Sequence, residues 1–228
     1  MMFLNDIPFN LNAASLFDEY KIQPGTVLCE KLELIIHEVR NTAKPKAMYK
    51  ISYIDEKDGD AVTLDGVVFT SRALEKNLAP VERVFPYIAT CGTEVDRIET
   101  DPSDTLVNFW LYQLKGRILQ SAMSYLICHI HKNYRTGNLA SMNPGSGDES
   151  VWPLDQQKIL FSIFKDAASG IGVRLTGASV LVPDVSLMGI LFPSKIEFQS
   201  CQLCHREKCP GRKAPFDEVV WKSIYEEG

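Results

Sequence analysis

The sequence lacks the features of several large protein classes. It has no long basic stripe, and its 24 basic and 29 acidic residues give a formal net charge of −5, so nucleic-acid binding has little electrostatic support. Its most apolar stretch, residues 118–130, is too short to cross a membrane. The apolar start has no basic region and is interrupted by Asp6 and Pro8, which makes it a poor signal peptide. We therefore expect a cytoplasmic protein without nucleic-acid or membrane partners.

Familiar catalytic and nucleotide-binding motifs are missing as well. The GxGxxG and GxxxxGK spacings do not occur, so neither a dinucleotide fold nor a phosphate-binding P-loop is indicated. No Ser/His/Asp arrangement can be justified, and His129 and His131 are spaced so that they cannot share a helix face. Any chemistry must therefore come from less common motifs.

The hydrophobic pattern predicts an α+β fold. Residues 26–42 and 104–134 carry apolar side chains at helical spacing, and the second segment is long enough to be a central helix of the core. Shorter elements are expected as helices at 71–78, 155–169 and 216–225, and as strands at 48–54, 62–64, 67–69, 81–90, 172–176 and 186–192. Because these strands are joined mainly by hairpins, we predict a mainly antiparallel twisted sheet around the long helix.

Composition divides the chain into three parts. Residues 1–100 form an N-terminal α+β region, and residues 101–198 form a core that contains a Pro-Gly loop. Residues 199–228 form a C-terminal segment that contains clustered cysteines. We expect this division to follow the organisation of the fold.

A glycine-bearing loop before a predicted helix is the first candidate site. We call it the Pro-Gly loop, and it consists of Asn143, Pro144, Gly145, Ser146 and Gly147. Glycine allows close approach of the backbone to a ligand, and a following helix can direct N–H groups at a carboxylate or phosphate. Taken alone, the loop is also consistent with a purely structural bend.

Short motifs follow the Pro-Gly loop in a characteristic order. After the loop come a helix with Gln156 and Leu160, the segment 171–176 (Ile-Gly-Val-Arg-Leu-Thr), and then Pro183, Ser186, Gly189 and Phe192. Across residues 106–192 this order resembles the activation domain of cobalamin-dependent methionine synthase. In that family a Pro-Gly loop binds S-adenosylmethionine (AdoMet), and a helix leads into an Ile-Gly-x-x-Leu-Thr segment.

The resemblance implies an accessory role in corrinoid chemistry. It suggests that the Pro-Gly loop holds AdoMet as a small-molecule methyl donor, while a partner corrinoid protein or methyltransferase brings cobalamin for reductive methylation. In the family, the loop carries an arginine and a tyrosine, and the long helix before it carries an acidic residue that serves the ligand. Here Ser141 and Ser146 stand at the two loop positions, and residues 117–134 contain no Asp or Glu. A non-catalytic docking module for a corrinoid protein is therefore the alternative, and whether the chain is itself an enzyme stays open.

Three cysteines near the end form a second candidate site. The spacing Cys201-x2-Cys204-x4-Cys209 places two thiols on one turn with a third nearby, which suits an iron–sulfur cluster or zinc. A fourth ligand could come from His205, or from Cys91 or Cys29 through the fold. The alternatives are reduced thiols, a disulfide, or a zinc-stabilised interaction protein that kept only the fold.

Overall fold

Six α-helices form within residues 1–209 and 211–226, which are the residues that the computed structural model describes. The side chains of Thr26 and Asp104 cap two of them, because a side-chain oxygen at this position accepts a free N–H of the first turn. The helices are α1 (Ala13–Tyr20), α2 (Val27–Thr42), α3 (Arg72–Leu78), α4 (Thr105–Tyr134), α5 (Gln157–Phe164) and α6 (Glu218–Tyr225). The two long helices that the sequence predicts are confirmed.

Ten strands in the same residues form an eight-stranded sheet and a separate two-stranded hairpin. Every pairing between them is antiparallel. The strands are β1 (Met2–Leu4), β2 (Lys46–Tyr49), β3 (Ser52–Asp58), β4 (Ala61–Leu64), β5 (Val67–Thr70), β6 (Arg83–Thr90), β7 (Leu139–Met142), β8 (Arg174–Leu175), β9 (Leu181–Val182) and β10 (Ser186–Pro193). Asp65 and Gly66 have positive φ and turn β4 into β5, and an Asp-Gly pair is favourable for such a hairpin turn.

Short 3-10 helices complete the fold, and the observed elements correct two predictions. They are η1 (Thr93–Arg97), η2 (Leu154–Gln156), η3 (Lys165–Ile171) and η4 (Ser200–Leu203). The predicted helix at 155–169 is therefore broken into η2, α5 and η3, because Lys165 has positive φ and ends α5. The single strand predicted at 48–54 is wrong, since β2 and β3 pair with different parts of β6.

The strand β6 is the centre of the sheet. It pairs with β2 and β3 along one edge and with β10 along the other, and β10 in turn pairs with β7. The register places Gly189 of β10 opposite Tyr87 of β6. Because β7 leads directly into the Pro-Gly loop, this part of the sheet positions the loop. The sheet also joins the regions predicted as 1–100 and 101–198.

The long helix α4 packs against two different partners. Its buried residues include a series at four-residue spacing: Trp110, Leu114, Ile118, Ala122, Leu126 and Ile130. A step of four residues turns about 40° beyond a full helical turn, so this apolar stripe winds around the helix. The first half of the stripe packs with α1 and α2, and the second half packs on the sheet.

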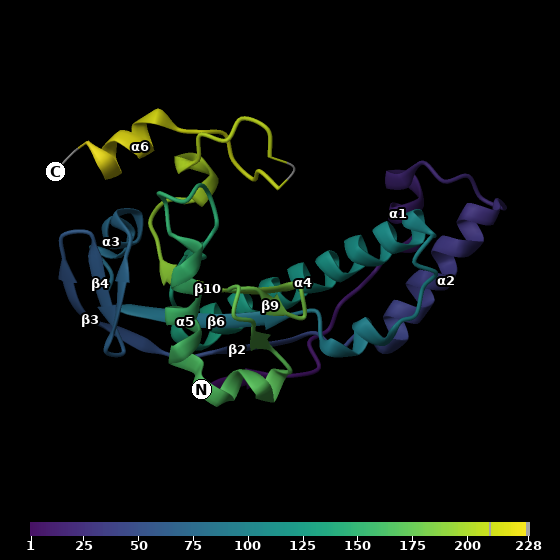
Figure 1. The fold of residues 1–228 in the computed structure, drawn as a ribbon, viewed down its shortest axis with the longest axis horizontal. Coiled ribbons are helices and arrows are strands. Elements are labelled where there is room, and N and C mark those ends of the chain that lie inside the picture. Colours follow the sequence, from purple (N-terminus) through teal and green to yellow (C-terminus); the bar gives the residue numbers. More distant parts are fainter. Residues whose placement is uncertain (210, 227–228) are drawn as a thin grey trace.

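Figure 1 shows the consequence of this winding for the shape of the molecule. The helices α1 and α2 lie beside one end of α4, whereas α3 with β3 and β4 lies at the opposite side of the molecule. The C-terminal segment with α6 runs along a third side. Among the described residues, no helix combines the length and the apolar character needed to cross a bilayer.

Candidate functional site

An open cleft of about 1270 Å³ lies beside α4. One wall is a face of α4 with residues at helical spacing: Gly116, Leu119, Gln120, Met123, Ile127, Cys128 and His131. The central strands contribute Tyr87, Leu187 and Leu191, and the Pro-Gly loop contributes Asn143 and Ser146. The remaining wall comes from residues 196–202, just after β10, and from Gly211, Lys213 and Ala214. The cleft thus brings together segments that are far apart in the sequence.

The Pro-Gly loop faces this cleft with only part of its length. Asn143 and Ser146 line the cleft, whereas Pro144 is buried. Gly145 and Gly147 have positive φ, and a Cβ on Gly145 would lie 2.7 Å from Leu154 Cδ1. These two glycines are therefore required by the backbone and by packing. Ligand binding by the five loop residues stays a prediction.

A neutral hydrogen-bond network forms the floor of the cleft beneath the loop. The Asn143 Nδ2 group donates to Tyr87 OH at 2.7 Å and to the Met188 carbonyl at 2.8 Å. The Ser141 hydroxyl lies 2.9 Å from Tyr87 OH. Burial raises the pKa of Tyr87, so this phenol stays protonated and serves as a hydrogen-bonding group rather than a base.

Comparison with known proteins identifies the fold. No protein-family model and no curated protein matches the sequence. The crystal structure of the MetH reactivation domain bound to AdoHcy (S-adenosylhomocysteine) matches with a TM-score of 0.55, over 89% of this chain and 82% of that chain. The chain has the fold of the MetH reactivation domain. The sequence identity is 11%, so the likeness concerns the fold, and it confirms the predicted α+β architecture.

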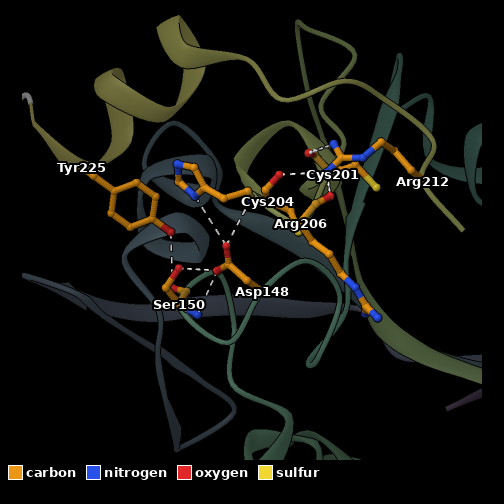
Figure 2. Close-up of polar contacts among 8 residues, drawn as sticks. Asp148, Ser150, Cys201, Cys204, Arg206, Arg212 and Tyr225 are labelled. Carbon is orange, nitrogen blue, oxygen red and sulfur yellow. Dashed lines mark hydrogen bonds and ion pairs between the residues drawn. The ribbon is translucent and has the colours of Figure 1, made fainter. Parts of the chain in front are cut away.

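On this MetH reactivation-domain fold, an arginine organises the cysteines near the C-terminus. We call residues 200–209 and 211–214 the cysteine loop. The Arg212 guanidinium donates to the backbone carbonyls of Cys201 at 3.1 Å, Cys204 at 3.0 Å and Ala214 at 3.0 Å, and also to that of Arg206. Figure 2 shows Arg212 among these cysteines. Because a guanidinium is a planar fork of five donors, one side chain can fix several turns of a loop.

The cysteine loop is also anchored to the segment that follows the Pro-Gly loop. His205 lies 3.7 Å from the Asp148 carboxylate through its ring nitrogen, and its ring packs against Phe216. Asp148 in turn accepts a hydrogen bond from the backbone of Ser150 at 3.1 Å, and Tyr225 OH donates to the Ser150 carbonyl at 3.3 Å. Figure 2 shows the contacts that link Asp148, Ser150 and Tyr225. The two predicted site segments are therefore neighbours.

The predicted metal site on Cys201, Cys204 and Cys209 is not supported. Among residues 1–209 and 211–226, no group of three or more His, Cys, Asp or Glu side chains is arranged to hold a metal ion. Cys204 is buried, and Cys201 Sγ accepts a hydrogen bond from Lys213 N at 3.4 Å. All six thiols are free. Hydrogen bonds from Arg212 to the backbone carbonyls of Cys201 and Cys204 cross-link this segment.

The suggested fourth metal ligands are used elsewhere in the fold. Cys29 and Cys91 belong to the core around α2 and the first half of α4. Burial raises the pKa of the Cys91 thiol to about 12, so it is protonated and unreactive. The His205 ring packs against the rings of Phe216 and Trp221. These residues contribute packing.

Several cleft residues could not be expected from motifs. Cys128 and His131 lie one turn apart on α4, and His131 Nδ1 lies 3.1 Å from the Gly137 carbonyl. Their helical spacing was a usable signal, because it places both on one face. Glu197 and Lys213 enter the cleft from loops, and a loop carries no periodicity from which its direction could be predicted.

We predict that Gly189→Ala displaces the Pro-Gly loop. A Cβ at this position would lie 2.2 Å from Asn143 Nδ2 and 2.5 Å from the Met142 carbonyl oxygen, and backbone at that distance must shift. Overpacking of this kind lowers the free energy of unfolding by about 2 kcal/mol, which chemical denaturation measures. Gly177→Ala is the control, because a Cβ there meets no heavy atom within 4 Å. Equal effects of the two changes would contradict the packing argument.

We also predict that Arg212→Ala opens the cysteine loop. Hydrogen bonds to charged groups contribute about 1.5–3 kcal/mol each, and several are lost together. The buried Cys204 should then react with iodoacetamide at least about tenfold faster, measured by mass spectrometry of the native protein. The control is Arg206→Ala, since Arg206 joins these contacts through its backbone carbonyl. An unchanged alkylation rate in Arg212→Ala would show that the guanidinium does not hold the loop.

Proposed function

We propose that the protein binds AdoMet or AdoHcy in the cleft beside α4 and supports reactivation of a corrinoid-dependent methyltransferase. One observation carries this proposal. The cleft lies along the Pro-Gly loop, in a fold shared with a reactivation domain whose crystal structure holds AdoHcy. Pockets for small molecules combine apolar walls with polar groups that fix the orientation of the ligand, and both kinds of side chain line the cleft.

The lining suits a nucleoside with a thioether or sulfonium group. Leu119, Met123 and Ile127 of α4 give an apolar wall against which a base can pack. The partly exposed Asn143 also lines the cleft, and its hydrogen bonds to Tyr87 OH and the Met188 carbonyl fix it in place. Because these groups are held by one another, binding would not require the floor to reorganise.

In this role the protein acts mainly by positioning. AdoMet supplies a methyl group that an electron-rich acceptor can take, so the protein needs no nucleophile of its own. The side chains of the cleft would bind the donor and fix its orientation, and orientation alone contributes strongly to the rate of a transfer. The acceptor corrinoid would arrive with a partner corrinoid protein or methyltransferase.

A second candidate function follows from the uncharged character of the hydrogen-bond network that forms the floor of the cleft. Ser141 offers only a hydroxyl group, which lies within hydrogen-bonding distance of Tyr87 OH and Asn143 Oδ1. A carboxylate would therefore find no cation on the floor itself. This favours a docking module that keeps the shape of a reactivation domain without binding the methyl donor. Titration with AdoHcy separates the two functions.

We predict that AdoHcy binds with saturable heat in calorimetry and slows the alkylation of Cys128 and Cys201, because both line the cleft. Iodoacetamide labelling followed by mass spectrometry measures each thiol separately. Cys209 is the internal control, since it is partly exposed and lies outside the cleft lining. Absence of both heat and protection would leave the docking module as the better account.

A further inference from the structure

Full charges are scarce in the cleft. Among the described residues that line it, Glu197 is the one acid and Lys213 is the one residue with a permanent positive charge. The other lining group that could carry positive charge is His131, whose Nδ1 already lies 3.1 Å from the Gly137 carbonyl. The electrostatic character of the cleft therefore depends on two side chains, and both belong to the wall opposite α4.

Contacts made by neighbouring residues and by the local backbone fix the positions of Lys213 and Glu197 on this wall. The neighbouring Arg212 guanidinium fixes the cysteine loop, and the Lys213 N–H donates to Cys201 Sγ at 3.4 Å. Beside Glu197, the buried Phe198 anchors the turn, and Phe198 N donates to the Ile196 carbonyl at 3.1 Å. Both charged residues are thus attached to ordered segments.

The charged ends themselves are available to a ligand. Both side chains are exposed, and the ion pairs formed within the described residues involve neither Glu197 nor Lys213. A carboxylate and an ammonium that belong to the lining of one cleft and to none of these ion pairs can receive a ligand that carries both charges. The homocysteine end of AdoHcy has this chemistry, with one carboxylate and one ammonium group.

We propose that Lys213 binds the carboxylate and Glu197 the ammonium of a ligand with a zwitterionic amino-acid end. This inference rests on the proposed function, and it names the part of the ligand that the wall opposite α4 recognises. A carboxylate enters a partly apolar cleft unfavourably unless a cation pairs with it. The two residues therefore act in specificity, favouring amino-acid nucleosides over nucleosides without that end.

Calorimetry with two ligands tests the assignment on the full chain. The probes are AdoHcy and 5′-methylthioadenosine, which keeps the adenosine thioether and lacks the amino-acid end. We expect Lys213→Ala and Glu197→Gln each to weaken AdoHcy binding about fivefold, a loss typical of a solvent-accessible ion pair. Binding of 5′-methylthioadenosine should stay unchanged, which a merely structural role of these residues would not produce.

Matched variants from the cysteine loop provide the controls. Lys208→Ala and Glu207→Gln remove the same charges from exposed positions that do not line the cleft, and they should leave both affinities unchanged. If the wild type binds AdoHcy and the Lys213 and Glu197 variants bind it equally well, this assignment is wrong while the proposed function stands. If the wild type binds neither ligand, the proposed function fails and the assignment fails with it.

Discussion

The amide of Asn143 holds the centre of the site together. Its Nδ2 group reaches Tyr87 of β6 and the Met188 carbonyl of β10, so a single side chain ties the Pro-Gly loop to two paired strands. This contact requires glycine at position 189, since any Cβ there would lie against Asn143. In the middle of the loop, Gly145 N donates to the Trp152 carbonyl at 2.8 Å. The loop is therefore fixed at its start and at its middle, and a fixed loop can present a preformed surface to a ligand.

The existence of the cleft follows from how α4 is buried. Its apolar stripe winds from α1 and α2 to the sheet, and a neighbouring face of the helix is only partly buried. Leu119, Met123 and Ile127 lie on this face and line the cleft. The opposite wall is completed by the cysteine loop, which the guanidinium of Arg212 holds in shape. A central helix and a loop cross-linked by hydrogen bonds thus form two walls of the same open cleft.

Sequence patterns were sufficient to predict the elements in which the local side-chain chemistry and the tertiary packing favour the same structure. The two long helices begin within a residue of the predicted positions 26 and 104, and β4 and β5 cover the strands predicted at 62–64 and 67–69. Short strands such as β1 and β7 could not be predicted, because three or four residues carry too little periodicity and form only by pairing with a distant strand.

The candidate site was predictable only in part for a related reason. Gly145 is visible in the sequence because its role is local, whereas Glu197 and Lys213 reach the cleft through loop geometry. The spacing of the cysteines is compatible with a metal, but Arg212 supplies the cross-links to Cys201 and Cys204 instead. The spacing of the cysteines along the sequence does not reveal that Arg212 forms these contacts.

The most direct test of the cleft as a ligand site is methyl NMR of protein labelled at its methionine methyl groups. Met123 lines the cleft, whereas Met48 is buried in the core. Addition of AdoHcy should shift the Met123 signal in a saturable way and leave the Met48 signal in place. A saturable shift of Met48 without a shift of Met123, or no shift of either, would contradict the account.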